Sequence, residues 1–151
     1  MMPVTDKISK ERVAKFAEVF TPPGTVFFMI LQDGIRACVA DVDKTIFDPA
    51  CGHGQFPCSE LVWKMFFGLE RLDEDFILRA LKSLHGVDIQ PASVETTKNH
   101  LIQTACDAYK FFTGNEFTRT DEARQILDEN FICGDSLKIM HEWAGRQQSL
   151  F

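Results

Sequence analysis

Long apolar runs are missing from this sequence of 151 residues, and no stretch approaches the roughly 20 apolar residues that a membrane-spanning helix needs. The N-terminal stretch MMPVTDKISKERVAKF has basic residues but lacks the apolar core of a signal peptide. Repeats, low-complexity tracts and long linkers are absent too. We therefore expect a cytoplasmic protein, not bound to a membrane, that folds as one compact unit.

An excess of basic residues is also missing, since the formal net charge is −6. A protein that holds duplex DNA unaided usually shows a basic face, because phosphate neutralisation supplies much of the affinity. The composition therefore predicts that the chain meets DNA only through a partner.

Paired cysteine clusters are missing as well. The five cysteines are odd in number and scattered, which favours a reducing compartment over a disulfide framework. Cys51, His53 and Cys58 have a spacing that could hold zinc, but no second pair of ligands follows them. Thiols in the core or in a loop are the favoured interpretation, and zinc is the alternative.

Phenylalanine, in contrast, is abundant, with 14 residues. Of the Phe-Phe pairs, those at 27–28 and 66–67 are expected in the core or in an interface. The N-terminal residues 1–40 are predicted to be a helical segment. It has an amphipathic helix over 7–19 and a helix-like run over 25–41, which Gly34 either divides or belongs to.

The rest of the chain, residues 41–151, alternates short apolar runs with helical patterns. Strands are predicted over 44–48, 85–89 and 131–135, and helices over 58–69, 73–84, 91–111 and 120–130, the last being a helix or a turn. Such alternation predicts parallel pairing through right-handed crossovers. The expected fold is therefore α/β, of Rossmann type.

Three acids stand where such a sheet places its ligand, at the carboxyl ends of the strands: Asp48, Asp88 and Asp135. A bare glycine loop over 52–54 joins the first strand to a helix, whose N-terminus attracts negative groups. A carboxylate that ends the second strand suits the two hydroxyls of a ribose. Helix capping is the alternative for Asp88 and a turn is the alternative for Asp135, but the three together favour nucleoside binding.

The stretch FDPACGHGQF resembles a signature of the N6-adenine (amino-group) DNA methyltransferases of restriction–modification systems. The stretches EVFTPPGTVFFMI, LHGVDIQPASVETTKNHL and FICGDSL are similar to three further motifs of that family. The four occur in the family's order and span residues 12–140.

The resemblance implies a Rossmann-like methyltransferase fold with S-adenosylmethionine as cofactor. The residues that it implies for binding are, at the methionine end, Phe20, Thr21, Pro22, Asp48, Pro49, Ala50, Gly52 and Gly54, and, at the ribose and adenine, Asp88, Ile89, Asp135 and Ser136.

The residues themselves point the same way. The Asp48 carboxylate suits an ammonium group, and the apolar side chain of Ile89 suits the face of an adenine. For Cys51 we expect a small packing residue, for His53 a solvated loop residue and for Phe56 a core residue.

The family's transfer motif, (Asn/Asp/Ser)-Pro-Pro-(Tyr/Phe), is absent, because the only Pro-Pro lies at 22–23. That motif holds the flipped adenine in the family. No catalytic residue is therefore assigned, and we expect no adenine methylation by this chain alone.

The resemblance also implies that strand one would pair with a fourth strand, and the chain stops about where that strand would begin. The unpaired edge would need a cover. We expect a homo-oligomer, a complementary methyltransferase subunit, or rearranged N-terminal helices to supply it.

Two other functions remain open. One is a non-catalytic S-adenosylmethionine-binding protein that regulates, or interacts within, a restriction–modification or phage system. The other is a small-molecule methyltransferase, which the FDPACGHGQF signature disfavours.

Overall fold

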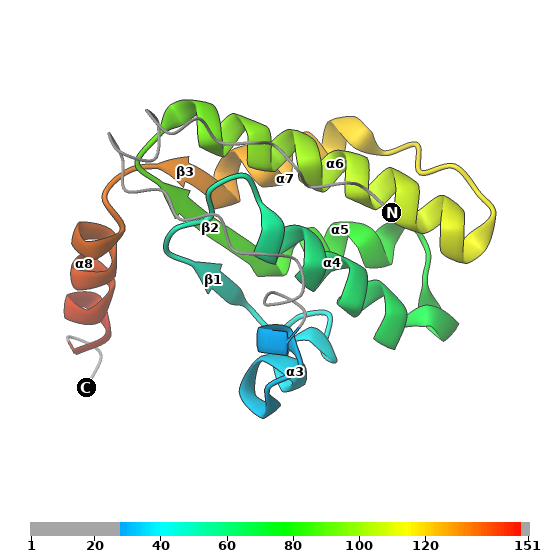
Figure 1. The fold of residues 1–151 in the computed structure, drawn as a ribbon, viewed down its shortest axis with the longest axis horizontal. Coiled ribbons are helices and arrows are strands. Elements are labelled where there is room, and N and C mark those ends of the chain that lie inside the picture. The colour runs from blue at the N-terminus through cyan, green and yellow to red at the C-terminus, as the bar shows by residue number, and fades with distance from the viewer. Residues whose placement is uncertain (1–27, 149–151) are drawn as a thin grey trace.

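The structure, a computed structural model, describes residues 28–148 of the chain (Figure 1). In chain order its elements are α3 (Asp33–Val39), β1 (Ile46–Asp48), α4 (Gln55–Phe67), the 3₁₀ turn η1 (Leu69–Arg71), α5 (Glu74–Ser83), β2 (Leu84–Asp88), α6 (Pro91–Thr113), α7 (Thr120–Asn130), β3 (Phe131–Cys133) and α8 (Ser136–Gln148). The helix predicted over 7–19 and the predicted cofactor residues Phe20, Thr21 and Pro22 lie outside the described residues.

The three strands form one parallel sheet in the order β1-β2-β3. Ile46 pairs with Leu84, and Val87 pairs with Ile132. The α/β class and the three predicted strands are thus confirmed, although each strand is displaced or shortened by one or two residues relative to the prediction. Within residues 28–148, β1 pairs only with β2, so its other side has no neighbouring strand there.

Helices α4 and α6 pack against each other and against the sheet (Figure 1). Helices α5 and α7 run directly into β2 and β3, so they lie at the amino ends of these strands. The Asn130 side chain ties the two junctions together by donating to the carbonyl oxygens of Leu81, Lys82 and Leu84 at 3.1–3.3 Å. This arrangement leaves the carboxyl edge of the sheet to the loops.

Spacing along α4 and α6 explains their contact. Leu61 and Met65 on α4 are fully buried, as are Leu101 and Ala105 on α6, and each pair is four residues apart on one helix face. Phe131 of β3 belongs to the same core cluster and is also fully buried. The core therefore lies between the sheet and these two helices, directly beneath the loops of the carboxyl edge.

The expectation that the Phe-Phe pairs lie in the core is wrong for the described residues. Phe28, Phe66 and Phe67 are 72%, 50% and 37% exposed. Trp63 and the latter two form a cluster with ring centroids 5.6–5.8 Å apart at the solvent side of α4. The core expectation fails because α4 turns its Leu61–Met65 face inward, which leaves the next residues on its outer face. Their place in an interface stays a prediction.

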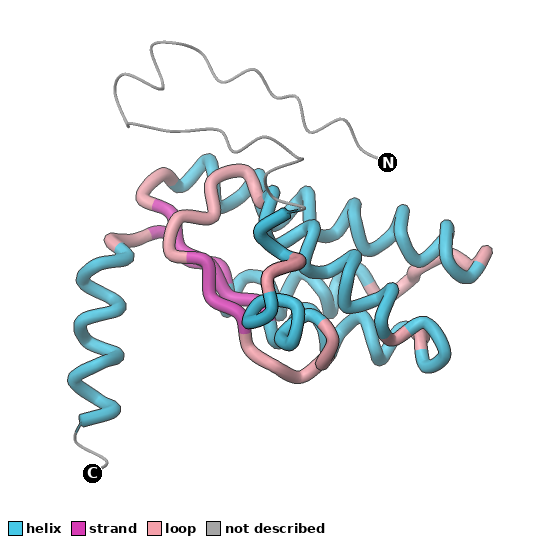
Figure 2. Tube along the Cα trace, turned by 60° about the horizontal axis from the view of Figure 1, so that its bottom comes forward, coloured by secondary structure: helices cyan, strands magenta, loops and turns pink. Residues whose placement is uncertain are grey.

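Helix α8 follows β3 directly and was not predicted. Figures 1 and 2 show it extending away from α4–α7. A hollow of about 170 Å³ separates part of α8, at Ile139 and Met140, from the sheet residues Phe47 and Ile132. Near the other end of the described chain, the helix-like run is interrupted at Leu31, so Gly34 falls in the first turn of α3.

No helix among the described residues is long and apolar enough to cross a membrane.

Candidate binding site at the carboxyl edge of the sheet

In the loop between β1 and α4, each residue from Cys51 to Gly54 makes at least one backbone hydrogen bond. The Cys51 N–H donates to the Val87 carbonyl at 3.0 Å, and the Gly54 N–H donates to the Cys51 carbonyl at 2.8 Å. The Gly52 carbonyl accepts from the Thr97 hydroxyl at 2.7 Å. Strand β2 and helix α6 thus fix the loop before any ligand arrives.

His100 of α6 completes this attachment. Its Nδ1 lies 2.8 Å from the carbonyl oxygen of His53, and a carbonyl only accepts, so Nδ1 carries the proton. The expectation that His53 is a solvated loop residue is wrong, because its exposed fraction is 8%. Its burial follows from the docking of the loop on α6.

The two glycines of the loop differ in the space that a side chain would find there. Gly54, with φ of 91°, caps α4, and a Cβ there would lie 3.1 Å from Cγ2 of Thr97. Gly52, with φ of 53°, has nothing within 4 Å of the same position. Gly54 is therefore required for packing, whereas the space over Gly52 stays open to an approaching group.

The start of α4 adds hydrogen-bond donors beside this opening. No side chain caps the helix at Gly54, and its first turn contains no acid. The N–H groups of Gln55 and Phe56 precede the first intrahelical bond, and Pro57 has no N–H. Phe56 itself is partly buried against the Ile30–Val39 cluster, as expected for a packing residue.

The three predicted acids lie on, or just after, successive strands, and each is displaced along the carboxyl edge relative to the one before it. Asp48 is the last residue of β1 and pairs in register with Gly86, two residues before Asp88. Asp88 in turn pairs with Cys133, two residues before Asp135. Each acid thus lies one strand over and two residues further along than the one before it. Because β3 ends at Cys133, Asp135 lies just beyond the strand that it was predicted to end.

Only one of the two carboxylate oxygens of Asp48 has a hydrogen-bond partner among the described residues. Its Oδ1 accepts from the Ala50 N–H at 3.0 Å. Its Oδ2 is buried and has no hydrogen-bond partner among the described residues. Burial raises the pKa of the Asp48 carboxyl, the bond from Ala50 opposes this, and the charge of Asp88 adds to the increase. Such an oxygen is an acceptor ready for a positively charged donor.

The Asp88 side chain connects the end of β2 to the loop between β1 and α4. Its Oδ2 accepts from the Gly52 N–H at 3.1 Å, and its Oδ1 accepts from the Gln90 N–H at 2.9 Å. Helix α6 has no side-chain cap, so Asp88 is not its capping residue. Each carboxylate oxygen keeps a further lone pair, which leaves Asp88 able to accept from a ligand as well.

The remaining predicted cofactor-binding residues lie at or near the surface, around the carboxyl edge of the sheet. Pro49 and Ala50 are exposed in the turn after β1, and Ile89 is 67% exposed. Asp135 is exposed and accepts from the Leu137 N–H at 3.0 Å, while Ser136, partly buried, begins α8. Asp135 thus makes a turn at the start of α8, as its alternative interpretation held, and its carboxylate is also accessible from solvent.

Of the two thiols in this region, Cys51 is buried and Cys58 is partly buried. Cys51 is 4% exposed and belongs to the core cluster, as expected for a packing residue. Burial raises the pKa of Cys51 and of Cys58 to about 12, so both thiols hold their protons near neutrality. Within residues 28–148 no group of three or more candidate ligands gathers to hold a metal ion.

Two buried ionisable side chains on α4 were not predicted, Glu60 and Lys64, which are 5% and 1% exposed. Burial raises the pKa of Glu60 to about 8, and the negative charge of Asp48 adds to the increase, while Lys64 opposes it. Burial also lowers the pKa of Lys64. The signal was available, because both residues interrupt the apolar run that forms the inner face of this helix.

Together these features offer contacts that suit a ligand with a cationic end and a hydroxyl-rich end. The unpartnered oxygen of Asp48 suits a cation, and the space over Gly52, between the first two acids, is open. Asp88 suits hydroxyl groups, and the exposed Ile89 beside it offers an apolar surface.

Comparisons of the chain with protein-family models, with curated proteins and with solved structures found no match. The residues of the carboxyl edge and the motifs that they belong to are therefore the basis of the function proposed next.

Proposed function

We propose that this chain binds S-adenosylmethionine and belongs with the DNA adenine-N6 methyltransferases, in a Rossmann-like fold of which the described residues form one part. Methyl transfer would need residues from outside these 151, because they contain no (Asn/Asp/Ser)-Pro-Pro-(Tyr/Phe) motif. The observation that carries the proposal is the fixed loop from Asp48 to Gly54, open over Gly52 and flanked by two carboxylates.

The methionine end of the cofactor fits the first half of this loop. Its ammonium group would bind the buried Oδ2 of Asp48, which has no other partner in the described part of the chain. Its carboxylate would meet the N–H groups at the start of α4, which carry the positive end of the helix dipole. Because the loop is already held by β2 and α6, binding would lose little backbone entropy.

The nucleoside end fits the second and third strands. The ribose hydroxyls would donate to Asp88, whose oxygens each keep a free lone pair. The adenine would lie on the exposed side chain of Ile89, with its amino group directed to Asp135. These are the positions that the resemblance implies. The strand register, which brings the three acids to one edge of the sheet, supports them.

A second candidate is a cofactor-binding protein without catalysis, which regulates or interacts within a restriction–modification or phage system. The exposed aromatic residues at the end of α4 favour an interaction role, since Phe66 and Phe67 face solvent beside Trp63. Both candidates bind the same cofactor at the same residues. They differ in whether a partner chain restores methyl transfer.

Calorimetric titration with S-adenosylmethionine and S-adenosylhomocysteine tests cofactor binding. The Asp88→Asn variant keeps the shape of the side chain but removes its charge, and we expect at least about tenfold weaker binding, because two hydrogen bonds to a charged acceptor are weakened. Asp121→Asn, at an exposed position on α7, is the matched control and should bind as the parent does. A folded parent chain that binds neither compound contradicts the proposal.

Incubation with methyl-labelled cofactor and DNA separates the two candidates. We expect no transfer to adenine by the chain alone, and transfer when a chain with the missing motif is added. Binding of the cofactor with no transfer in any such mixture would favour the regulatory alternative.

A further inference from the structure

The buried ammonium group of Lys64 is surrounded by backbone carbonyl oxygens. Its Nζ lies 3.1 Å from the oxygen of Cys38, 2.7 Å from that of Asp41, 3.3 Å from that of Val42 and 2.9 Å from that of Lys44. Lys64 is 1% exposed, so these oxygens take the place of water around its charge. An ammonium has three N–H groups, and four acceptors use all of them. The four oxygens therefore form a carbonyl cage around one positive charge.

The carbonyl cage has the character of a cation site. Carbonyl dipoles that converge on one point repel one another unless a positive charge lies between them. Rings of backbone carbonyls replace the hydration shell of a monovalent cation in the same way in ion channels. Lys64 thus supplies from its own side chain the cation that this stretch of backbone requires.

Lys64 also joins two segments of the candidate binding site. The carbonyl cage ends at Lys44, two residues before Ile46 begins β1, and β1 ends at Asp48. Helix α4 begins at Gln55, directly after the glycine loop, and Lys64 belongs to that helix. The chain that enters β1 is therefore hydrogen-bonded to the helix that leaves the loop. Among the described residues β1 has a neighbouring strand on one side only, so this attachment adds to what the sheet provides.

The segments joined in this way are the two that we propose meet the amino-acid end of the cofactor. Asp48, at the end of β1, would bind the ammonium group of the ligand. The N–H groups at the start of α4 would bind its carboxylate. One end of the ligand would thus bridge β1 and α4, and its affinity would depend on how well their separation is held before binding.

We propose that Lys64 is a positioning residue of the cofactor site, whose ammonium group fills the carbonyl cage and so holds Asp48 at a fixed separation from the start of α4. Lys64 touches no ligand itself. The inference rests on the proposed function for the identity of the ligand, an amino acid joined to a nucleoside. The nucleoside end would bind at Asp88 and Ile89, at and after the end of β2, which Lys64 does not hold.

Refilling the carbonyl cage tests it without any cofactor. Lys64→Ala removes the side chain beyond Cβ, and methylammonium reproduces the lost Cε and Nζ. In chemical denaturation of this variant, methylammonium chloride should raise the ratio of folded to unfolded chain about elevenfold at ten times its dissociation constant. Tetramethylammonium has no N–H group and should give no such gain at the same ionic strength.

The matched control acts on the same stretch of chain from outside. Arg79 of α5 donates to both carboxylate oxygens of Asp43 at 3.1 and 2.5 Å, and both side chains are exposed. Arg79→Met removes this contact and leaves the carbonyl cage filled, so methylammonium should not stabilise it. Equal effects of the two cations on Lys64→Ala, or an equal gain from methylammonium in Arg79→Met, overturn the carbonyl cage.

A comparison of two ligands tests the positioning role. S-adenosylhomocysteine has the amino-acid end, and methylthioadenosine does not. In calorimetric titration we expect Lys64→Ala to bind S-adenosylhomocysteine at least about tenfold more weakly than the parent, and methylthioadenosine equally well. Methylammonium should restore the first affinity, and Arg79→Met should bind both ligands as the parent does. Lys64→Gln keeps two N–H donors and replaces Lys64→Ala in this comparison where the latter is unfolded.

The failures of the two proposals are distinguishable. A parent that binds S-adenosylhomocysteine, beside a folded Lys64 variant that loses affinity for both ligands alike or for neither, overturns the positioning role and leaves cofactor binding intact. A residue that only stabilised the fold would give that result. A parent that binds neither ligand overturns the proposed function and the positioning role together, while the methylammonium experiment still decides whether the carbonyl cage is a cation site.

Discussion

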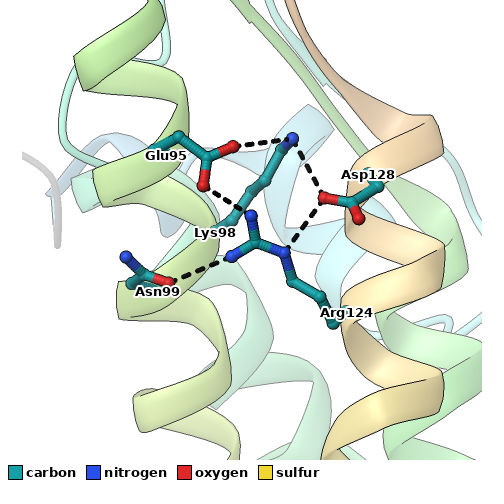
Figure 3. Close-up of polar contacts among 5 residues, drawn as sticks. All are labelled: Glu95, Lys98, Asn99, Arg124 and Asp128. Carbon is teal, nitrogen blue, oxygen red and sulfur yellow. Dashed lines mark hydrogen bonds and ion pairs between the residues drawn. The ribbon is translucent and has the colours of Figure 1, made fainter.

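Two groups of charged side chains in the described part of the chain are buried or half-buried, and they differ in whether each charge has a partner of the opposite sign. Between α6 and α7, Lys98 and Arg124 bridge Glu95 and Asp128, and Arg124 also donates to Asn99 (Figure 3). Every charge there has a partner of the opposite sign.

Close to β1, in contrast, one oxygen of Asp48 has no hydrogen-bond partner within residues 28–148, and the Lys64 ammonium binds only backbone carbonyls. Paired charges between two helices fix how the helices pack. An unpaired buried carboxylate oxygen at the carboxyl edge of a sheet destabilises the fold, and is expected where a ligand completes the pairing. The first cluster is therefore structural, and the second lies where we propose that the cofactor binds.

The largest effect should come from removing the buried ammonium group of Lys64. In Lys64→Met four carbonyl oxygens lose their donor, and we expect the free energy of unfolding to fall by about 3 kcal/mol or more. Chemical denaturation measures this, with Lys82→Met on the exposed face of α5 as the control, expected within about 0.5 kcal/mol of the parent. Equal losses in the two variants would mean that the Lys64 contacts contribute nothing.

Glu60 should give the chain a distinctive dependence on pH. Its pKa is about 8 in the folded state and about 4.5 when unfolded, so between these values the folded state holds a proton that the unfolded state has lost. Stability should therefore decrease as pH rises through this interval, by up to about 1.4 kcal/mol per unit. Denaturation of the parent and of Glu60→Gln at several pH values tests this, and parallel curves would contradict it.

The paired cluster should respond less, and in the opposite direction. Arg124→Met removes three partners at once, and we expect a loss of about 1 kcal/mol that shrinks in high salt. Hydrogen bonds from Lys98 and Arg124 lower the pKa of Asp128 and Glu95, so this contribution is lost as pH falls into the acid range.

The control for that variant is Lys110→Met, which breaks the exposed pair with Glu116. Its effect should be smaller than the error of the measurement. A larger loss here than in Arg124→Met would remove the distinction between a network and an isolated pair.

Strand and helix positions were predictable from the sequence because apolar runs and helical periodicity alternate clearly after residue 44. The position of Asp48 and Asp88 at one edge of the sheet was predictable, because parallel strands bring their carboxyl ends to the same edge. The burial of His53 was not, since it depends on His100, 47 residues further on. Glu60 was missed because an acid within a helix usually faces solvent, although this one interrupts the apolar run on the inner face of α4.

The attachment of the loop to later parts of the chain has a consequence for how the protein folds. Gly52 is held by residues 36 and 45 positions further along, and His53 by one 47 positions further along. Contacts of such long separation form only after the intervening chain has been ordered. The loop is thus among the last parts to form, and it stays in place only while both β2 and the first turns of α6 are folded. The Gly52 N–H donates to Asp88, so slow hydrogen exchange at this amide would report on the end of β2, a strand to which Gly52 does not belong.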